Sequence, residues 1–128
     1  MEKEFVPYKQ ALALKELLGF DEECLKIWEK TMLFTTLVNP EEFKRVVSER
    51  YTKAPTFSQA FRWFREKYDL RIWIESNYGV AKFEYVIATT NPNFIDKQFN
   101  DFSSYKTYEE AELACLEKLI EIVEQYKS

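Results

Sequence analysis

Two stretches of alternating side chains, separated by a short turn, constrain the fold of this 128-residue chain more than any other feature. Over 71–75 the isoleucines alternate with Arg, Trp and Glu, and over 82–87 Phe, Tyr and Ile alternate with Lys, Glu and Val. A period of two is typical of β-strands that are buried on one face. The pattern predicts a β-hairpin over about 71–90, with Trp73 on the face opposite the isoleucines.

The same two stretches predict which residues face each other. A turn at Tyr78-Gly79 would place Ile74 opposite Phe83 and Glu75 opposite Lys82, with Ile72 opposite Tyr85. This register sets apolar side chains together and joins opposite charges, which cross-strand pairs prefer. We therefore expect this register.

Helices are expected on both sides of the hairpin, because apolar residues recur at helical spacing next to capping residues. The first runs from Pro7 to a stop at Gly19 and the second begins at Asn39-Pro40. Capping boxes at Thr56 and Thr107 open two more, over about 56–68 and 107–126. A hairpin is favoured within 21–38 and a further strand within 91–105. The expected fold is α+β: an antiparallel β-sheet (the hairpin about 71–90 plus further strands) packed by three or four helices, in a single globular domain, 1–128.

Composition excludes many chemistries. The chain has no histidine, which removes Ser-His and Cys-His catalysis and the histidine-containing zinc sites. Two glycines are too few for a phosphate-binding or dinucleotide-binding glycine loop. We expect no catalytic, cofactor-binding or metal-binding residues, and no cofactor. The carboxylates Asp96 and Asp101 leave a carboxylate-dependent hydrolase as a third-ranked alternative.

The predicted location is the cytoplasm. No signal peptide is recognisable at the amino terminus, and the uncharged run Thr31–Val38 is far too short to span a membrane. Cys24 and Cys115 lie among apolar residues, which suits reduced thiols. We expect no membrane partner.

Two surfaces are candidate interaction sites. Arg62, Trp63 and Lys67 form the first, since Trp63 is rotated away from the apolar stripe of its helix. Residues 39–73 carry eight basic and five acidic side chains, so this patch could contact nucleic acid. The order helix, strand, strand, further strand, helix from Thr56 is that of a double-stranded-RNA-binding domain. However, such domains place basic residues at the start of the last helix, where this chain has Glu109-Glu110-Ala111-Glu112, so nucleic acid is disfavoured.

The last helix provides the second surface, formed by Leu113, Leu116 and Ile120. Its apolar arc is broader than a single sheet face can cover. These residues must therefore be buried by another element, either in the same chain, with the Pro7–Leu18 helix as the candidate, or in a partner such as a second copy.

Three motifs resemble a family of small uncharacterised proteins of gut bacteria and their phages and mobile elements. They are Phe5-Val6-Pro7-Tyr8 leading into the first helix, Ala54-Pro55-Thr56 leading into Phe61-Arg62-Trp63-Phe64, and Thr107-Tyr108-Glu109-Glu110. The resemblance implies a biological setting and no activity. The expected function is that of a non-enzymatic accessory protein acting by protein–protein interaction, with a nucleic-acid-binding accessory protein as the alternative.

Overall fold

The computed structural model describes residues 4–20, 22, 24, 26–29, 32–35, 52–77, 82–94, 96–99 and 104–127. The chain divides into two compact units, Met1–Thr56 and Phe57–Ser128. Each contains a three-stranded antiparallel sheet, and the helices with these sheets confirm the α+β class. The strands form two sheets where the sequence predicted one. That all 128 residues form one domain stays a prediction, and the helix expected from Asn39 lies outside the described residues.

In the first unit, α1 (Tyr8–Leu18) begins directly after Pro7. Gly19 ends it in the left-handed conformation, with φ 69°, which glycine adopts without steric cost. The Gly19 amide donates to the Lys15 carbonyl at 3.2 Å and the Phe20 amide to the Leu14 carbonyl at 3.0 Å. These bonds satisfy carbonyls of the last turn, so the predicted glycine stop is confirmed.

The sheet of the first unit has the order β2-β1-β3. The hairpin favoured within 21–38 is confirmed as β1 (Lys26–Glu29) and β2 (Met32–Thr35), while β3 (Thr52–Ala54) was not predicted. The Val6 amide donates to the Pro55 carbonyl at 2.8 Å, and the Trp28 indole Nε1 donates to the Val6 carbonyl at 2.9 Å. The segment before α1 is thereby bonded to both β1 and the residue that follows β3.

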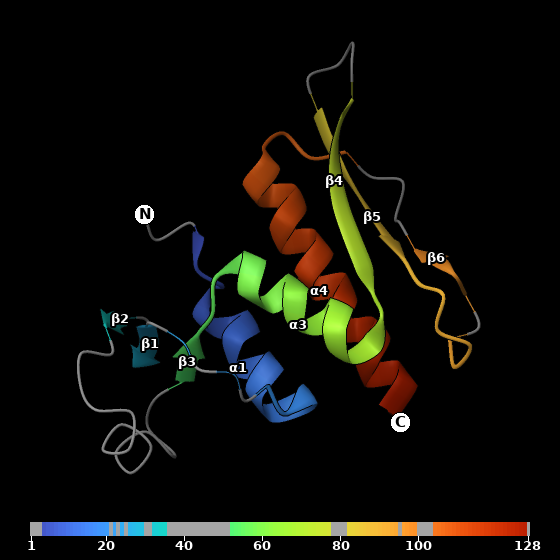
Figure 1. The fold of residues 1–128 in the computed structure, drawn as a ribbon. Coiled ribbons are helices and arrows are strands. Elements are labelled where there is room, and N and C mark those ends of the chain that lie inside the picture. Colours follow the sequence, from blue (N-terminus) through green and yellow to red (C-terminus); the bar gives the residue numbers. More distant parts are fainter. Residues whose placement is uncertain are drawn as a thin grey trace. The chain divides into compact units, whose positions relative to one another are not determined.

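The second unit contains α3 (Phe57–Tyr68), β4 (Arg71–Asn77), β5 (Lys82–Ala88), β6 (Gln98–Phe99) and α4 (Tyr108–Lys127). Its sheet has the order β4-β5-β6, and β6 is the further strand expected within 91–105. The Thr107 hydroxyl accepts the Glu110 amide at 3.1 Å, which caps α4 as predicted. Figure 1 shows α4 running alongside the β4–β5 hairpin.

One face of this sheet forms the core of the second unit. The rings of Phe83 and Tyr108 lie 6.1 Å apart, which places α4 on the face that Phe83 shares with Tyr85 and Ile87. Tyr85 is 3% exposed and Ile87 is fully buried. The helix also packs against α3. The core therefore lies between the Ile87 face and the two helices.

The predicted register of the hairpin is wrong by two residues. Ile74 faces Tyr85, Ile72 faces Ile87, and Glu75 faces Glu84. A shift of two keeps every side chain on its face, whereas a shift of one would reverse them. The observed register brings Ile87 into the ladder opposite Ile72. The predicted position of Trp73 is therefore confirmed: it is 44% exposed, whereas the isoleucines on either side are half-buried.

Candidate functional site

The predicted patch on α3 lacks the exposed indole on which it depended. Trp63 is only 4% exposed, so its predicted exposure is wrong, although Arg62 and Lys67 are exposed. Ala60 is fully buried and lies between Trp63 and Phe64 on the helix surface, which extends the buried arc to the indole. The Lys67 Nζ lies 5.0 Å from the centre of the Trp63 ring, in cation–π contact. Trp63 is a packing residue of α3.

The predicted interface on α4 is mostly enclosed. Leu116 is fully buried, Ile120 is 7% exposed, and Leu113 is half-buried. Because α4 packs against α3 as well as the hairpin, it has a second supporting element. Leu116 and Ile120 are therefore core residues and do not present a surface to a partner.

The element order expected from Thr56 onward is confirmed, since α3, β4, β5, β6 and α4 follow one another. The charge at the start of α4 remains acidic, with Glu109 and Glu110 exposed in its first turn. This charge opposes phosphate binding at that position. Asp96 is exposed, and Asp101 lies outside the described residues. Within the described ranges, no group of three or more Asp, Glu or Cys residues could hold a metal ion.

The outer face of the second sheet exposes a tryptophan beside charged side chains. We call it the Trp73 face: Arg71, Trp73 and Glu75 of β4, with Glu84 and Val86 of β5. Trp73 lies opposite Val86, which is 9% exposed, and Glu75 lies opposite Glu84. The Trp73 Nε1 donates to the Glu75 Oε1 at 2.8 Å. This bond fixes a carboxylate beside a solvent-exposed indole.

Two residues, Asp69 and Leu70, connect α3 to β4, the strand that carries Trp73. The φ of Asp69 is 57°, which makes Asp69 the one non-glycine residue with positive φ among those described. Aspartate tolerates this conformation better than most residues because its short side chain can bond locally. The Asp69 amide donates to the Arg65 carbonyl at 3.0 Å, and the Leu70 amide to the Phe64 carbonyl at 3.3 Å. Asp69 thus ends α3 as Gly19 ends α1.

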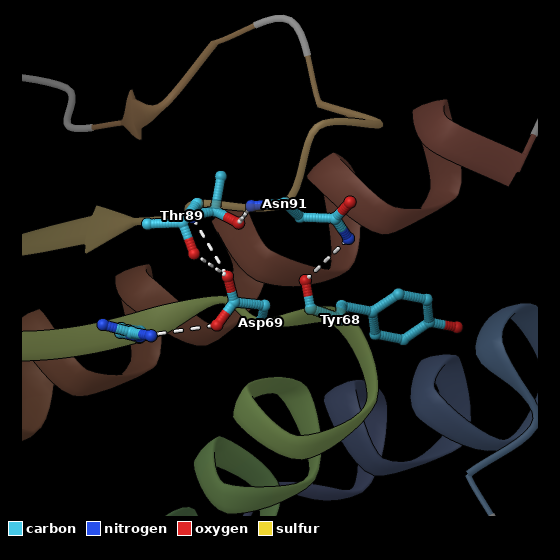
Figure 2. A network of polar contacts seen from close by, with 6 residues as sticks. Tyr68, Asp69, Thr89 and Asn91 are labelled. Atoms are coloured by element: carbon cyan, nitrogen blue, oxygen red, sulfur yellow. Dashed lines mark hydrogen bonds and ion pairs between the residues drawn. The ribbon is translucent and has the colours of Figure 1, made fainter.

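The Asp69 side chain also holds the end of β5. Its Oδ2 accepts the Thr90 amide at 3.0 Å and the Thr90 hydroxyl at 2.6 Å, while Oδ1 lies 3.4 Å from Arg71 Nε. In return, Asn91 Nδ2 donates to the Tyr68 carbonyl at 3.2 Å, as Figure 2 shows. Residues 68–69 and 90–91 therefore bind each other through side-chain to main-chain bonds in both directions. We call this arrangement the Asp69 clasp.

The clasp continues the register of the hairpin. Arg71 pairs with Ala88, so two residues further out Asp69 and Thr90 occupy opposite positions in the same alignment. In the register predicted from the sequence, Asp69 would stand opposite Ala88 and would lose both bonds to Thr90. The clasp therefore forms only in the observed register, which is also the register that pairs Trp73 with Val86.

The hydrogen bonds of the clasp make the Asp69 carboxyl more acidic. The bonds from Thr90 lower the pKa of the Asp69 carboxyl below its ordinary value, with a smaller contribution from Arg71. No sequence pattern predicted the clasp. One signal was present: an aspartate, rather than a glycine, stands where α3 ends and a strand begins two residues later.

A second titratable group lies on α4. Glu112 is half-buried one turn after Tyr108, and burial together with the nearby Glu109 raises its pKa to about 7. Burial and the charges of Glu112, Cys115 and Glu109 raise the pKa of Tyr108. Glu112 lies one turn beyond the positive end of the helix, whose first turn contains Glu109 and Glu110 as its acidic residues. Because burial and the charge of Glu109 both disfavour its ionised form, the Glu112 carboxylate is unfavourable at neutral pH.

Comparison of the chain with family models, with curated proteins and with solved structures gave no match. The described helices include none that is both long enough and apolar enough to cross a bilayer. The candidate site is thus defined by its own geometry: the exposed Trp73 face, positioned by the Asp69 clasp.

Replacing Asp69 tests the clasp. We expect the free energy of unfolding to fall in the order wild type, Asp69→Asn, Asp69→Gly, Asp69→Ala. Asparagine tolerates a positive φ and its side-chain oxygen can still accept a hydrogen bond from Thr90. Glycine only tolerates the positive φ, and alanine does neither. Urea denaturation at pH 7 measures the order, with the exposed Asp96→Ala as control. Because folding lowers the pKa of Asp69, its carboxylate stabilises the fold at pH values above the unfolded pKa. This stabilisation disappears as the pH falls below about 4.

An Asp69→Gly variant that is less stable than Asp69→Ala would contradict the role of the positive φ at this position.

Replacing Glu112 tests its raised pKa. Between about pH 4.5 and 7 the folded chain binds a proton that the unfolded chain has lost, so wild-type stability falls as the pH rises through this window. Glu112→Gln should lack this pH dependence and should be about 1 kcal/mol more stable than the wild type at pH 8. The expected difference is smaller than the pKa shift alone would give, because the side chain is still partly exposed to water. Urea denaturation at pH 4.5 and 8 measures both, with the exposed Glu124→Gln as the charge control. An unchanged pH profile in the Gln variant would disprove the prediction.

Proposed function

We propose that this protein is a non-enzymatic accessory protein that binds another protein through the Trp73 face. The observation that carries the proposal is an indole that is 44% exposed on an open sheet face and held in place by a 2.8 Å bond to Glu75. Tryptophan is enriched among the residues that contribute most to protein interfaces, because its large ring buries much area at small conformational cost. A prepositioned ring loses less freedom on binding than a free one.

The surroundings of Trp73 suit an interface. Val86 supplies an apolar floor opposite the indole, and the charged Arg71, Glu75 and Glu84 surround it. An apolar centre with a polar rim is the usual anatomy of a protein–protein interface. The other surfaces predicted from the sequence are weaker supports, because Trp63, Leu116 and Ile120 are buried.

The setting that we propose follows from the sequence resemblance. The protein would act in the cytoplasm of a gut bacterium, in association with a phage or mobile element. Cys24 and Cys115 form no disulfide, which suits a reducing compartment. Binding of nucleic acid is the disfavoured alternative, because the start of α4 is acidic.

An affinity experiment with a matched exposed aromatic tests the proposed surface. Tagged wild type, Trp73→Ala and Tyr126→Ala are each used to capture partners from the cell that encodes the protein, and thermal denaturation checks that all three are folded. Tyr126 is 42% exposed on α4, so it controls for loss of an exposed ring. We expect one partner to be captured equally by wild type and Tyr126→Ala and at least about tenfold less by Trp73→Ala. Equal capture by Trp73→Ala would show that the partner binds elsewhere.

A further inference from the structure

The second sheet has a long strand at one of its edges. In the order β4-β5-β6, β4 is an edge strand, and among the residues that the structure describes it pairs with β5 alone. The pairing runs without a bulge from Arg71 to Asn77, and the strand contains neither proline nor lysine. Proteins commonly protect a sheet edge with a very short strand, a proline, a bulge or charged side chains. The opposite edge is short in this way, since β6 has two residues, whereas β4 has seven.

Hydrogen bonds on the far side of β5 show which main-chain groups of β4 point outward. The Phe83 amide donates to the Tyr105 carbonyl and the Tyr105 amide to the Phe83 carbonyl, each at 2.8 Å, so Phe83 bonds away from β4. Phe83 lies opposite Ser76. In an antiparallel pair, two opposed residues either both bond to each other or both point away, and this alternates along the strand. Ser76, Ile74 and Ile72 therefore direct their N–H and C=O groups to the open edge.

The side chains of β4 are complementary to their own reversed order. The segment Arg71-Ile72-Trp73-Ile74-Glu75 has a base at one end, an acid at the other and Trp at its centre. Antiparallel pairing of two copies about Trp73 would place Arg71 of each copy opposite Glu75 of the other, and Ile72 opposite Ile74. Cross-strand neighbours of opposite charge, and apolar neighbours of matched shape, stabilise a sheet. The outward main-chain groups of Ile72 and Ile74 would face each other and exchange N–H···O=C bonds.

We propose that β4 is a dimerisation edge, at which two copies of this chain pair β4 with β4 in antiparallel direction about Trp73. A symmetric pairing of this kind uses the same edge on both copies and is closed, so it stops at two chains. Ile72 and Ile74 are half-buried, whereas Ile87 on the next strand is fully buried. The isoleucines of the second copy would cover apolar area at this edge. The dimer goes beyond the proposed function and does not depend on it, since it uses the edge of the sheet and sets two Trp73 faces side by side.

Other alignments of the two strands fit less well. A centre at Ile72 keeps the main-chain bonds but places Asp69 of one copy opposite Glu75 of the other, which opposes like charges. A centre at Ile74 places Trp73 opposite Glu75 and leaves Arg71 without an acid across the edge. A strand of a different protein could add to the same edge. The second copy is favoured because the chain itself provides the matching charges.

Exchanging the charges at the two ends of the segment tests the pairing. Sedimentation equilibrium measures the association of the wild type, of Arg71→Glu, of Glu75→Arg and of an equal mixture of the two variants, and thermal denaturation checks that each is folded. We expect the wild type to dimerise with a dissociation constant of about 1–100 μM, because strand pairing buries less area than a standard interface. Each variant alone opposes like charges and should associate at least about tenfold more weakly. The mixture should recover the wild-type association, because it restores opposite charges at both ends.

The matched controls are Lys106→Glu and Glu124→Arg, which make the same charge changes at exposed positions away from β4. Alone and mixed, they should associate as the wild type does. If the control variants lose and regain association to the same extent, net charge governs the association and the β4 edge is rejected. A wild type that stays monomeric at about 1 mM would also overturn the proposal.

Hydrogen exchange on the unaltered protein gives a second test that needs no variant to fold. By the alternation described above, the amides of Trp73 and Glu75 bond to β5 in the monomer, whereas those of Ile72 and Ile74 gain a partner only in the dimer. Raising the protein concentration across the dissociation constant should slow exchange of the Ile72 and Ile74 amides about tenfold and leave the other two unchanged. A dimer without this protection would use another surface and would contradict the β4 edge. If capture of a partner still requires Trp73 in a monomeric chain, the proposed function stands and the dimer fails.

Discussion

The Asp69 clasp is the interaction on which the arrangement of the second unit depends. Asp69, in the left-handed conformation, ends α3 two residues before β4 begins and accepts two hydrogen bonds from Thr90, beyond the end of β5. Asn91 completes the clasp by donating to the Tyr68 carbonyl, the last of the helix. Because these bonds form in one alignment only, they fix the register of the hairpin from its open end. The cross-strand pairs of the Trp73 face, Trp73 with Val86 and Glu75 with Glu84, follow from that alignment.

The choice between the two registers can be understood from magnitudes. The predicted register would have gained the exposed pair Glu75–Lys82, and an exposed ion pair contributes about 0–1 kcal/mol. The observed register instead pairs Ile72 with the fully buried Ile87 and permits the clasp. The clasp, which forms only in the observed register, therefore outweighs the surface charges.

Sequence reasoning succeeded where the signal was local and failed where it depended on distant partners. The glycine stop at Gly19, the cap at Thr107 and the outward position of Trp73 all follow from short-range rules. The register was wrong because the bonds from Thr90 to Asp69 link residues 21 positions apart. Trp63 was misplaced because the buried arc of α3 is wider than its phenylalanine stripe. The Trp73 face was half-predictable: alternation placed the indole outward, but only the register revealed the opposed carboxylates.

The register of the β4–β5 hairpin is the central claim, since the clasp and the arrangement of the Trp73 face both require it. Cross-strand nuclear Overhauser effects measured on the isotope-labelled protein test it directly. The structure predicts contacts that align Trp73 with Val86 and Glu75 with Glu84. Contacts that align Ile74 with Phe83 and Glu75 with Lys82 would contradict it.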